Sequence, residues 1–219
     1  MPTQTQYEYL ERNFAIVKSP ILIIGSKLYE YDKFDFAHLF NGNGIFDIVG
    51  IDVSSGRNVD VIADITDLNN PYFDERQSYF NTVICMSVLM YVNNPFDAGL
   101  NIAKITQSGA ILFLSEPFTH KTTAMPLDHW RFTFNAFKSI FNQFNFNDSL
   151  SQCSFTRSNI TFNDLRDESI ELIYGKRHRD ENKVAYFIRR ISSKLFAKGF
   201  FKISRLMPEI SIFAIAVKK

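Results

Sequence analysis

Short, continuous runs of apolar and β-branched residues alternate with helix-like stretches along the first half of this 219-residue chain. The runs occupy residues 21–24, 46–51, 59–63, 82–85 and 110–114. Strands that are apolar throughout are buried on both faces, as in a parallel sheet that helices cover on both sides. The alternation therefore predicts an α/β fold with a doubly wound, mostly parallel sheet.

Three helices are expected between or after these strands, at residues 32–40, 95–106 and 133–144. Asn94 is a typical N-cap for the second helix, and Pro95 suits its first turn. Beyond residue 145 we expect a polar, turn-rich stretch, a strand, a basic helix and a last strand, at residues 149–163, 169–174, 183–205 and 211–217.

The domain organisation follows from the absence of a second apolar core, a repeat or a low-complexity linker in the sequence. We expect a single domain over residues 1–219. Its cofactor-binding core is expected at residues 18–145, and residues 146–219 are expected to add C-terminal strands and the basic amphipathic helix.

Composition narrows the class of protein. Hydrophobic residues make up 46% and charged residues 21%, which is typical of a folded globular chain. A net charge of +1 gives no overall field that attracts nucleic acid, so no nucleic-acid partner is expected. Two cysteines, a polar start at residues 1–11 and apolar runs shorter than the roughly 20 residues of a membrane span favour a cytoplasmic protein.

In an open parallel sheet, ligands bind outside the carboxyl ends of the strands. Gly25, Ser26 and Lys27 follow the first strand, and a glycine there lets the backbone approach a ligand closely. Met86 and Ser87 end the fourth strand. We expect these residues to line a cofactor cleft.

Two acidic residues stand at neighbouring strand ends. Asp52, followed by Val53, ends the second strand and is placed to accept hydrogen bonds from both hydroxyls of a ribose. Asp64 ends the third strand and is followed by Ile65, an apolar residue that suits the face of a purine. The alternative for each Asp is that it caps a turn or a helix.

The residues at 22–26, 49–64, 80–95 and 109–117, taken in this order, resemble the class I methyltransferases that bind S-adenosylmethionine. Residues 117–120 and 126–133 are similar to those of a subgroup with a Pro-x-Asp-(aromatic or His)-Trp-Arg-Phe-Thr signature. Members of that subgroup often accompany cell-surface glycan assembly. The resemblance covers residues 18–145 and implies a Rossmann-like sheet with an antiparallel last strand.

The resemblance also implies a role for each cleft residue. Gly25, Ser26 and Lys27 would line the amino-acid end of S-adenosylmethionine, Asp52 with Val53 its ribose, Asp64 with Ile65 its adenine, and Met86 with Ser87 its methionine portion. The chain departs from the family in three places. Ile23 replaces an acidic residue, Lys27 a glycine, and Met90-Tyr91 a Glu-His pair.

Methyl transfer needs an acceptor aligned with the donor methyl group and, for a hydroxyl or amine acceptor, a base. His120 and His129, which follow the fifth strand, are the candidates. Asp128 is placed to orient an imidazole, and Arg131 to pair with an anionic group of the substrate. Alternatively, the Trp-Arg-Phe-Thr run is structural and Thr133 is an N-cap. No cluster of Cys and His has the spacing of a metal site.

A basic segment lies near the C-terminus. Between Lys176 and Arg205 there are ten basic residues and two acids, Asp180 and Glu181, for a net charge of +8. Apolar residues recur at helical spacing from Val184 to Leu195. The segment is either a helix packed on the sheet or a contact for an anionic membrane surface or a phosphate-bearing, lipid-linked substrate. Nucleic acid is a further, weaker alternative.

Three functions compete at this stage. We expect a methyltransferase that acts on a small molecule, a glycan or a lipid-linked sugar. A catalytically degenerate methyltransferase fold that binds a partner is the main alternative, because of Ile23, Lys27 and Met90. A nicotinamide-dependent oxidoreductase would have Gly-x-Gly-x-x-Gly after the first strand, which residues 25–30 do not supply. The methyl acceptor and the oligomeric state do not follow from the sequence.

Overall fold

The computed structural model describes residues 2–120, 126–154, 162–164, 182–184, 186–188, 191 and 210–219. Residue contacts divide the chain into two units, Met1–Arg166 with Pro208–Lys219, and Asp167–Met207. All of the strands described below belong to the first unit. The strand expected at 169–174 lies outside the described residues, and the single domain expected over 1–219 stays a prediction.

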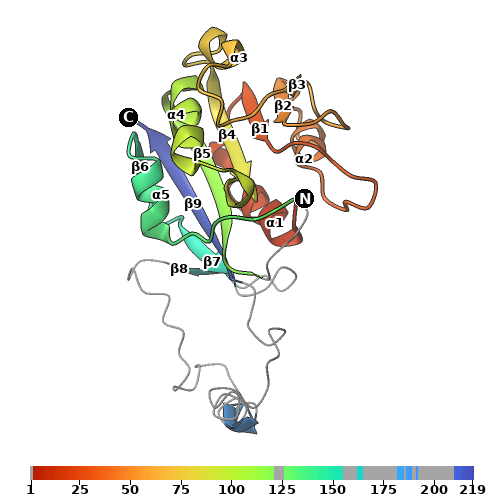
Figure 1. The fold of residues 1–219 in the computed structure, drawn as a ribbon. Coiled ribbons are helices and arrows are strands. Elements are labelled where there is room, and N and C mark those ends of the chain that lie inside the picture. Colours follow the sequence, from red (N-terminus) through yellow and green to blue (C-terminus); the bar gives the residue numbers. More distant parts are fainter. Residues whose placement is uncertain are drawn as a thin grey trace. The chain divides into compact units, whose positions relative to one another are not determined.

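The described strands form one nine-stranded sheet in the order β3-β2-β1-β4-β5-β9-β7-β8, with β6 also pairing with β9 (Figure 1). Their bounds are β1 Ile21–Ile24, β2 Ile48–Asp52, β3 Val61–Ile62, β4 Phe80–Met86, β5 Thr106–Thr119, β6 Phe144–Phe146, β7 Gln152–Ser154, β8 Phe162–Asp164 and β9 Ile210–Lys218. The first five pair in parallel, and β9 runs antiparallel to β5. The predicted doubly wound, mostly parallel sheet with an antiparallel last strand is confirmed.

The helices of this unit are α1 Gln4–Arg12, α2 Phe36–Gly42, α3 Pro71–Glu75, α4 Pro95–Ile105 and α5 Phe134–Ile140. The side chain of Asn94 caps α4 by accepting from the N–H of Phe96, and Thr133 caps α5 by accepting from the N–H of Ala136. Both caps satisfy N–H groups that have no partner within the helix. The predicted starts of α4 and α5 are thus confirmed.

Apolar side chains cover both faces of the sheet. On one face, Tyr9 of α1 and Phe40 of α2 are fully buried against strand residues such as Ile23. The Tyr9 ring packs against Phe213 of β9, with 4.8 Å between the ring centroids, and its hydroxyl donates to the carbonyl of Leu150 at 2.6 Å. Helices α3, α4 and α5 contact one another in sequence, and α4 contacts β5. The sheet therefore lies between helical layers, which is the arrangement that its continuous apolar strands require.

Several predicted boundaries were wrong. The strand expected from residue 46 begins at Ile48, and Phe46 is 75% exposed. The helix expected from residue 32 begins at Phe36, where Asp35 caps it, and the helix expected to run to residue 144 ends at Ile140. The stretch 149–163, expected to be turns, contains β7 and part of β8.

Among the described helices, none combines the length and the apolar character that crossing a membrane requires.

Candidate functional site

The order of the strands reverses at β1, which lies between β2 and β4. Ile24 of β1 is in register with Ile51 of β2 and with Cys85 of β4, so all three strands end at the same level. A crevice at such a reversal point is the usual ligand site of an open α/β sheet. The structure brings to this edge all of the predicted cofactor residues: Gly25, Ser26, Lys27, Asp52, Val53, Asp64, Ile65, Met86 and Ser87.

The turn after β1 requires a glycine. Gly25 has a φ of +70°, and its N–H donates to the carbonyl of Ile51 at 2.9 Å. A Cβ at this position would lie 2.5 Å from Cγ2 of Val88. The next residue, Ser26, is buried, and its Oγ has no hydrogen-bond partner. A buried hydroxyl without a partner is a feature expected where a polar ligand group binds.

The carboxylate of Asp52 joins two backbone segments at this edge. Its Oδ2 accepts from the N–H of Lys27 at 3.3 Å, and its Oδ1 accepts from the N–H of Ser54 at 3.1 Å. Oδ1 also accepts from the hydroxyl of Ser54 at 3.4 Å, so Oδ2 is the oxygen with a second acceptor position for a ligand hydroxyl. The Lys27 ammonium donates to Oγ of Ser54 at 3.0 Å, so this side chain is held next to the carboxyl end of β2. Val53 is exposed.

At the third strand end, Asp64 is exposed, and its Oδ1 accepts from both the N–H and the hydroxyl of Thr66, at 2.8 and 2.7 Å. This is the turn-capping arrangement that was the alternative to a ligand role. Ile65 is buried, and the side-chain amide of Asn101 on α4 donates to its carbonyl at 2.9 Å. The backbone of this turn is therefore fixed from the α4 side.

Ser87, directly after β4, is held by contacts from two other elements. Its φ is +57°, and its N–H donates to the carbonyl of Ser115 on β5 at 2.8 Å. The side-chain amide of Gln6 on α1 donates to Oγ of Ser87 at 2.8 Å and to Oγ of Ser115 at 3.3 Å. Helix α1, which sequence reasoning missed, thus reaches the same edge as the predicted cofactor residues.

A buried carboxylate, Glu116, organises the loop after β4. One of its oxygens accepts from the N–H groups of Val88 and Leu89, both at 2.8 Å, and the other accepts from the N–H of Met90 at 3.3 Å. Burial raises the pKa of Glu116 to about 8, although these three N–H groups lower it. Glu116 thus fixes the backbone of the loop that follows β4.

The loop after β5 is tied to the loop after β4. The N–H of His129 donates to the carbonyl of Met90 at 2.7 Å, and Nε1 of Trp130 donates to the carbonyl of Val92 at 2.8 Å. Met90 is buried and links Glu116 to His129 through its backbone N–H and carbonyl. His129 is exposed. Its backbone partner, Met90, follows Ser87 by three residues in the sequence.

Asp128 and Arg131, which were predicted to assist catalysis, contact each other and the backbone of their own loop. Arg131 pairs with Asp128 at 2.8 Å and donates to the carbonyl of His120 at 3.3 Å. Only 3% of the Asp128 side chain is exposed, against 29% for Arg131. His120 is half-buried. Arg131 therefore fastens the two ends of this loop to each other, as the structural alternative proposed.

Three residues at this edge were not singled out from the sequence: Gln6, Asp35 and Glu116. Asp35 lines a small hollow with Ile23, Gly25 and Ser26. Its Oδ1 accepts from Nδ2 of Asn58 at 2.8 Å, and Arg57 lies 3.7 Å from its other oxygen. Only for Gln6 does the sequence carry a signal, because Thr3 and Gln6 form a capping box at the start of α1.

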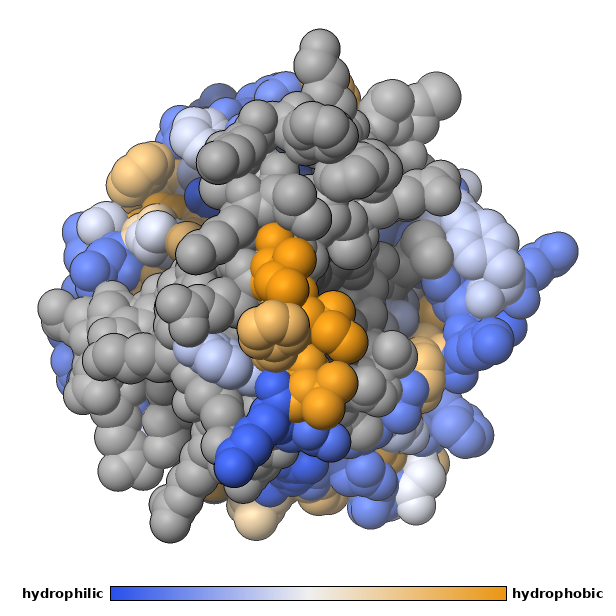
Figure 2. Space-filling model, turned by 90° about the horizontal axis from the view of Figure 1, so that it is seen from below, coloured by the Kyte–Doolittle hydropathy of each residue, from blue (hydrophilic) through white to orange (hydrophobic). Residues whose placement is uncertain are grey.

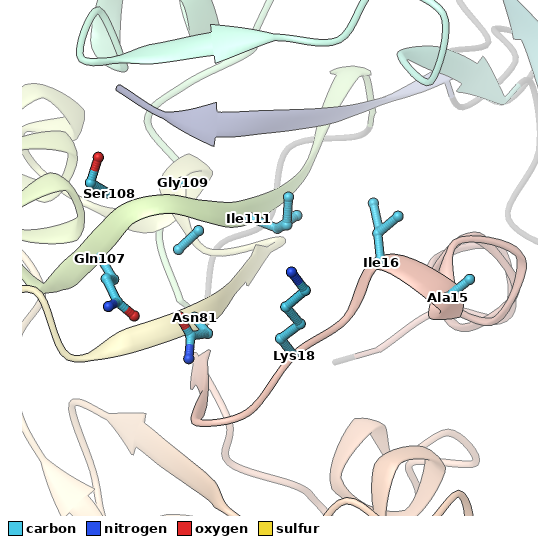
Figure 3. Close-up of a pocket in the computed structure, with 9 residues that line it drawn as sticks. Ala15, Ile16, Lys18, Asn81, Gln107, Ser108, Gly109 and Ile111 are labelled. Atoms are coloured by element: carbon cyan, nitrogen blue, oxygen red, sulfur yellow. The ribbon is translucent and has the colours of Figure 1, made fainter.

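A larger hollow of about 410 Å³ lies elsewhere (Figure 3). Lys18, Asn81 and Gln107 line it, next to the first residues of β1, β4 and β5. These are the amino ends of parallel strands, so the hollow opens at the edge opposite to the candidate site. Within the described part of the chain, no group of three or more His, Cys, Asp or Glu residues is placed to hold a metal ion.

No protein-family model matches the sequence, and no curated protein matches it. The structure is similar to that of a SAM-dependent methyltransferase from Archaeoglobus fulgidus, with a TM-score of 0.56 and 16% identity over 97% of this chain and 92% of that one. The fold is the class I methyltransferase fold. The structure is also similar to that of the 1,6-didemethyltoxoflavin-N1-methyltransferase of Burkholderia thailandensis, with a TM-score of 0.56 and 8% identity over 97% of this chain and 76% of that one.

A third similar structure is that of the cyclase SpnF, with a TM-score of 0.55 and 14% identity over 96% of this chain and 79% of that one. Its name shows that chains of this fold carry out other reactions besides methyl transfer. At such identities the likeness concerns the fold, and the chemistry has to be argued from the residues at the strand ends.

Proposed function

We propose that this protein binds S-adenosylmethionine at the carboxyl edge of β1 to β4 and transfers its methyl group to a small-molecule or glycan acceptor. The observation that carries the proposal is the turn after β1. There Gly25 leaves no room for a side chain, and the buried hydroxyl of Ser26 lacks a partner. This turn lies beside Asp52, in the fold shared with known methyltransferases.

The residues of the site suit the parts of this cofactor. Gly25 and Ser26 would receive its amino-acid end, Asp52 the two ribose hydroxyls, and the turn at Asp64 and Ile65 its adenine. Ser87, fixed by Gln6, would border the methionine portion. When bound, S-adenosylmethionine supplies an already activated methyl group. The protein therefore has to align the acceptor and exclude water, and such positioning is worth roughly 7–11 kcal/mol of barrier.

Asp35 would supply the carboxylate that the resemblance leads us to expect at position 23, where this chain has Ile23. In this proposal the ammonium group of the cofactor pairs with Asp35, which lines the same hollow as Gly25 and Ser26. Its side chain is 21% exposed, so the charge remains partly shielded from water. The pairing with Arg57 is long, at 3.7 Å, and the Arg57 side chain is 65% exposed, so a ligand ammonium competes with it easily.

We assign the role of proton acceptor to His129 ahead of His120. The backbone bond to Met90 brings His129 to the loop that borders the cleft, and its side chain is exposed and open to an acceptor hydroxyl or amine. A neutral imidazole accepts a proton readily near pH 7. The acceptor class rests on the signature at residues 126–133, which resembles that of proteins associated with glycan assembly.

Turnover is tested by incubating the protein with S-adenosylmethionine and a panel of sugars, nucleotide sugars and small amines while S-adenosylhomocysteine is measured. We expect product with at least one sugar, and a loss of about 100-fold in His129→Ala. His38→Ala, which removes an exposed histidine on α2, is the matched control and should retain full activity. Cofactor binding without product from any acceptor would instead favour the degenerate, partner-binding alternative.

A further inference from the structure

Part of the basic segment forms a capped helix in the unit Asp167–Met207. Residues 183–184, 186–188 and 191 are helical. Asn182 starts the helix, since its side chain accepts from the N–H of Val184 at 3.0 Å and its carbonyl accepts from the N–H of Tyr186 at 2.9 Å. The helix predicted within 183–205 is thus confirmed where the structure describes it.

One face of this helix is apolar and exposed. Val184 is 64% exposed, Phe187 63%, Ile188 62% and Ile191 45%. With 3.6 residues per turn these four side chains fall on one stripe of the helix. Figure 2 shows apolar side chains gathered in one cluster on the surface, with hydrophilic ones directly beside it. The competing prediction, that this stripe packs on the sheet, stays a prediction, and the vesicle experiment below separates the two.

The charge around this apolar stripe has a single sign. From residue 183 to residue 205 the chain contains no acidic residue. The same segment contains seven basic residues: Lys183, Arg189, Arg190, Lys194, Lys198, Lys202 and Arg205. From the sequence, helical periodicity predicts that Arg189 and Arg190 fall outside the apolar stripe. A surface that matches both features has to be apolar in its interior and negatively charged at its boundary.

We propose that this helix docks on an anionic lipid bilayer, with Val184, Phe187, Ile188 and Ile191 inserted among the acyl chains and the basic side chains at the headgroups. A helix with a basic polar face and Phe, Ile or Val on the other face lies in the plane of a membrane interface. A soluble acidic protein would match the charge, but a bilayer accommodates the exposed apolar stripe without a preformed groove. Nucleic acid would match the charge and leave the stripe in water.

The test is co-sedimentation of the full-length protein with vesicles of pure phosphatidylcholine and with vesicles that also contain phosphatidylglycerol. We expect binding to the anionic vesicles at least about tenfold stronger than to the neutral ones, and weaker as salt is raised. Phe187→Glu with Ile188→Glu should abolish binding, and so should replacement of Lys183, Arg189 and Arg190 by Gln.

Phe96→Glu with Leu100→Glu is the matched control. It adds the same charges at two exposed apolar residues of α4, which are 53% and 51% exposed, and should leave vesicle binding intact. All of the substituted side chains in both Glu variants are exposed, so an unchanged thermal transition confirms folding. The proposal is overturned if the protein ignores anionic vesicles, if the Phe187/Ile188 variant binds as well as the wild type, or if the segment binds DNA or RNA in a way that needs the basic residues and not the apolar ones.

Discussion

Substituting Gly25 by Ala should damage both stability and cofactor binding, because two separate costs meet at this residue. A non-glycine residue at a φ of +70° costs roughly 1–2 kcal/mol. The new Cβ would also lie 2.5 Å from Cγ2 of Val88, and overpacking of this kind costs roughly 1–3 kcal/mol. We therefore expect the free energy of unfolding to fall by about 2–5 kcal/mol.

Two further variants separate these costs. Gly44→Ala carries only the backbone cost, because its φ is +80° and nothing lies within 4 Å of a Cβ there, so it should lose about 1–2 kcal/mol. Gly25→Ala combined with Val88→Ala deletes the clashing methyl group and should regain part of the lost stability. Urea unfolding measures all of these changes. The reasoning is refuted if Gly25→Ala costs no more than Gly44→Ala, or if it binds S-adenosylmethionine as tightly as the wild type.

Two further predictions concern acidic side chains: Glu116 through the stability of the fold, and Asp35 through cofactor binding. Burial raises the folded-state pKa of Glu116 from 4.5 to about 8, so unfolding between these pH values releases a proton. The free energy of unfolding should therefore fall as the pH rises from 4.5 to 8, by up to roughly 1.4 kcal/mol per pH unit. Glu116→Gln keeps an oxygen for Val88 and Leu89 and should flatten this slope in urea titrations; an identical slope would exclude Glu116 as its origin. Asp35→Asn keeps the cap of α2 but removes the charge, so calorimetry should show about tenfold weaker binding of both S-adenosylmethionine and S-adenosylhomocysteine, whereas unchanged affinity would show that the ammonium group binds elsewhere.

The central strands were predictable because their side chains are apolar on both faces. All four residues of β1 are buried, so the strand appears in the sequence as a continuous apolar run. A run of this kind indicates a strand that is covered on both faces. The third strand shows the limit of this reasoning, since only Val61–Ile62 pairs with β2. Just before it, the side chain of Asp60 accepts from the N–H of Gly50 at 2.7 Å in place of a backbone partner.

The meeting of the candidate site residues at one edge of the sheet was predictable for a similar reason. A parallel sheet brings every carboxyl end to one side, so residues directly after each strand meet there whatever their identity. The roles of Glu116 and Asp35 were not predictable, because they depend on contacts between segments distant in the sequence. Glu116 binds N–H groups 26–28 residues away, and Asp35 binds Asn58 at a separation of 23. Helix α1 was missed because its first residues are polar, although its capping box was present.

The central claim is that Asp52 and the turn after β1 hold S-adenosylmethionine. Calorimetric titration of the wild type and of Asp52→Ala with S-adenosylmethionine and S-adenosylhomocysteine tests it most directly. The account predicts micromolar binding of both ligands to the wild type and a loss of both in Asp52→Ala, with Asp47→Ala, an Asp in the loop before β2, as the control that keeps wild-type affinity. Failure of either ligand to bind the wild type, or equal binding by Asp52→Ala, would contradict it.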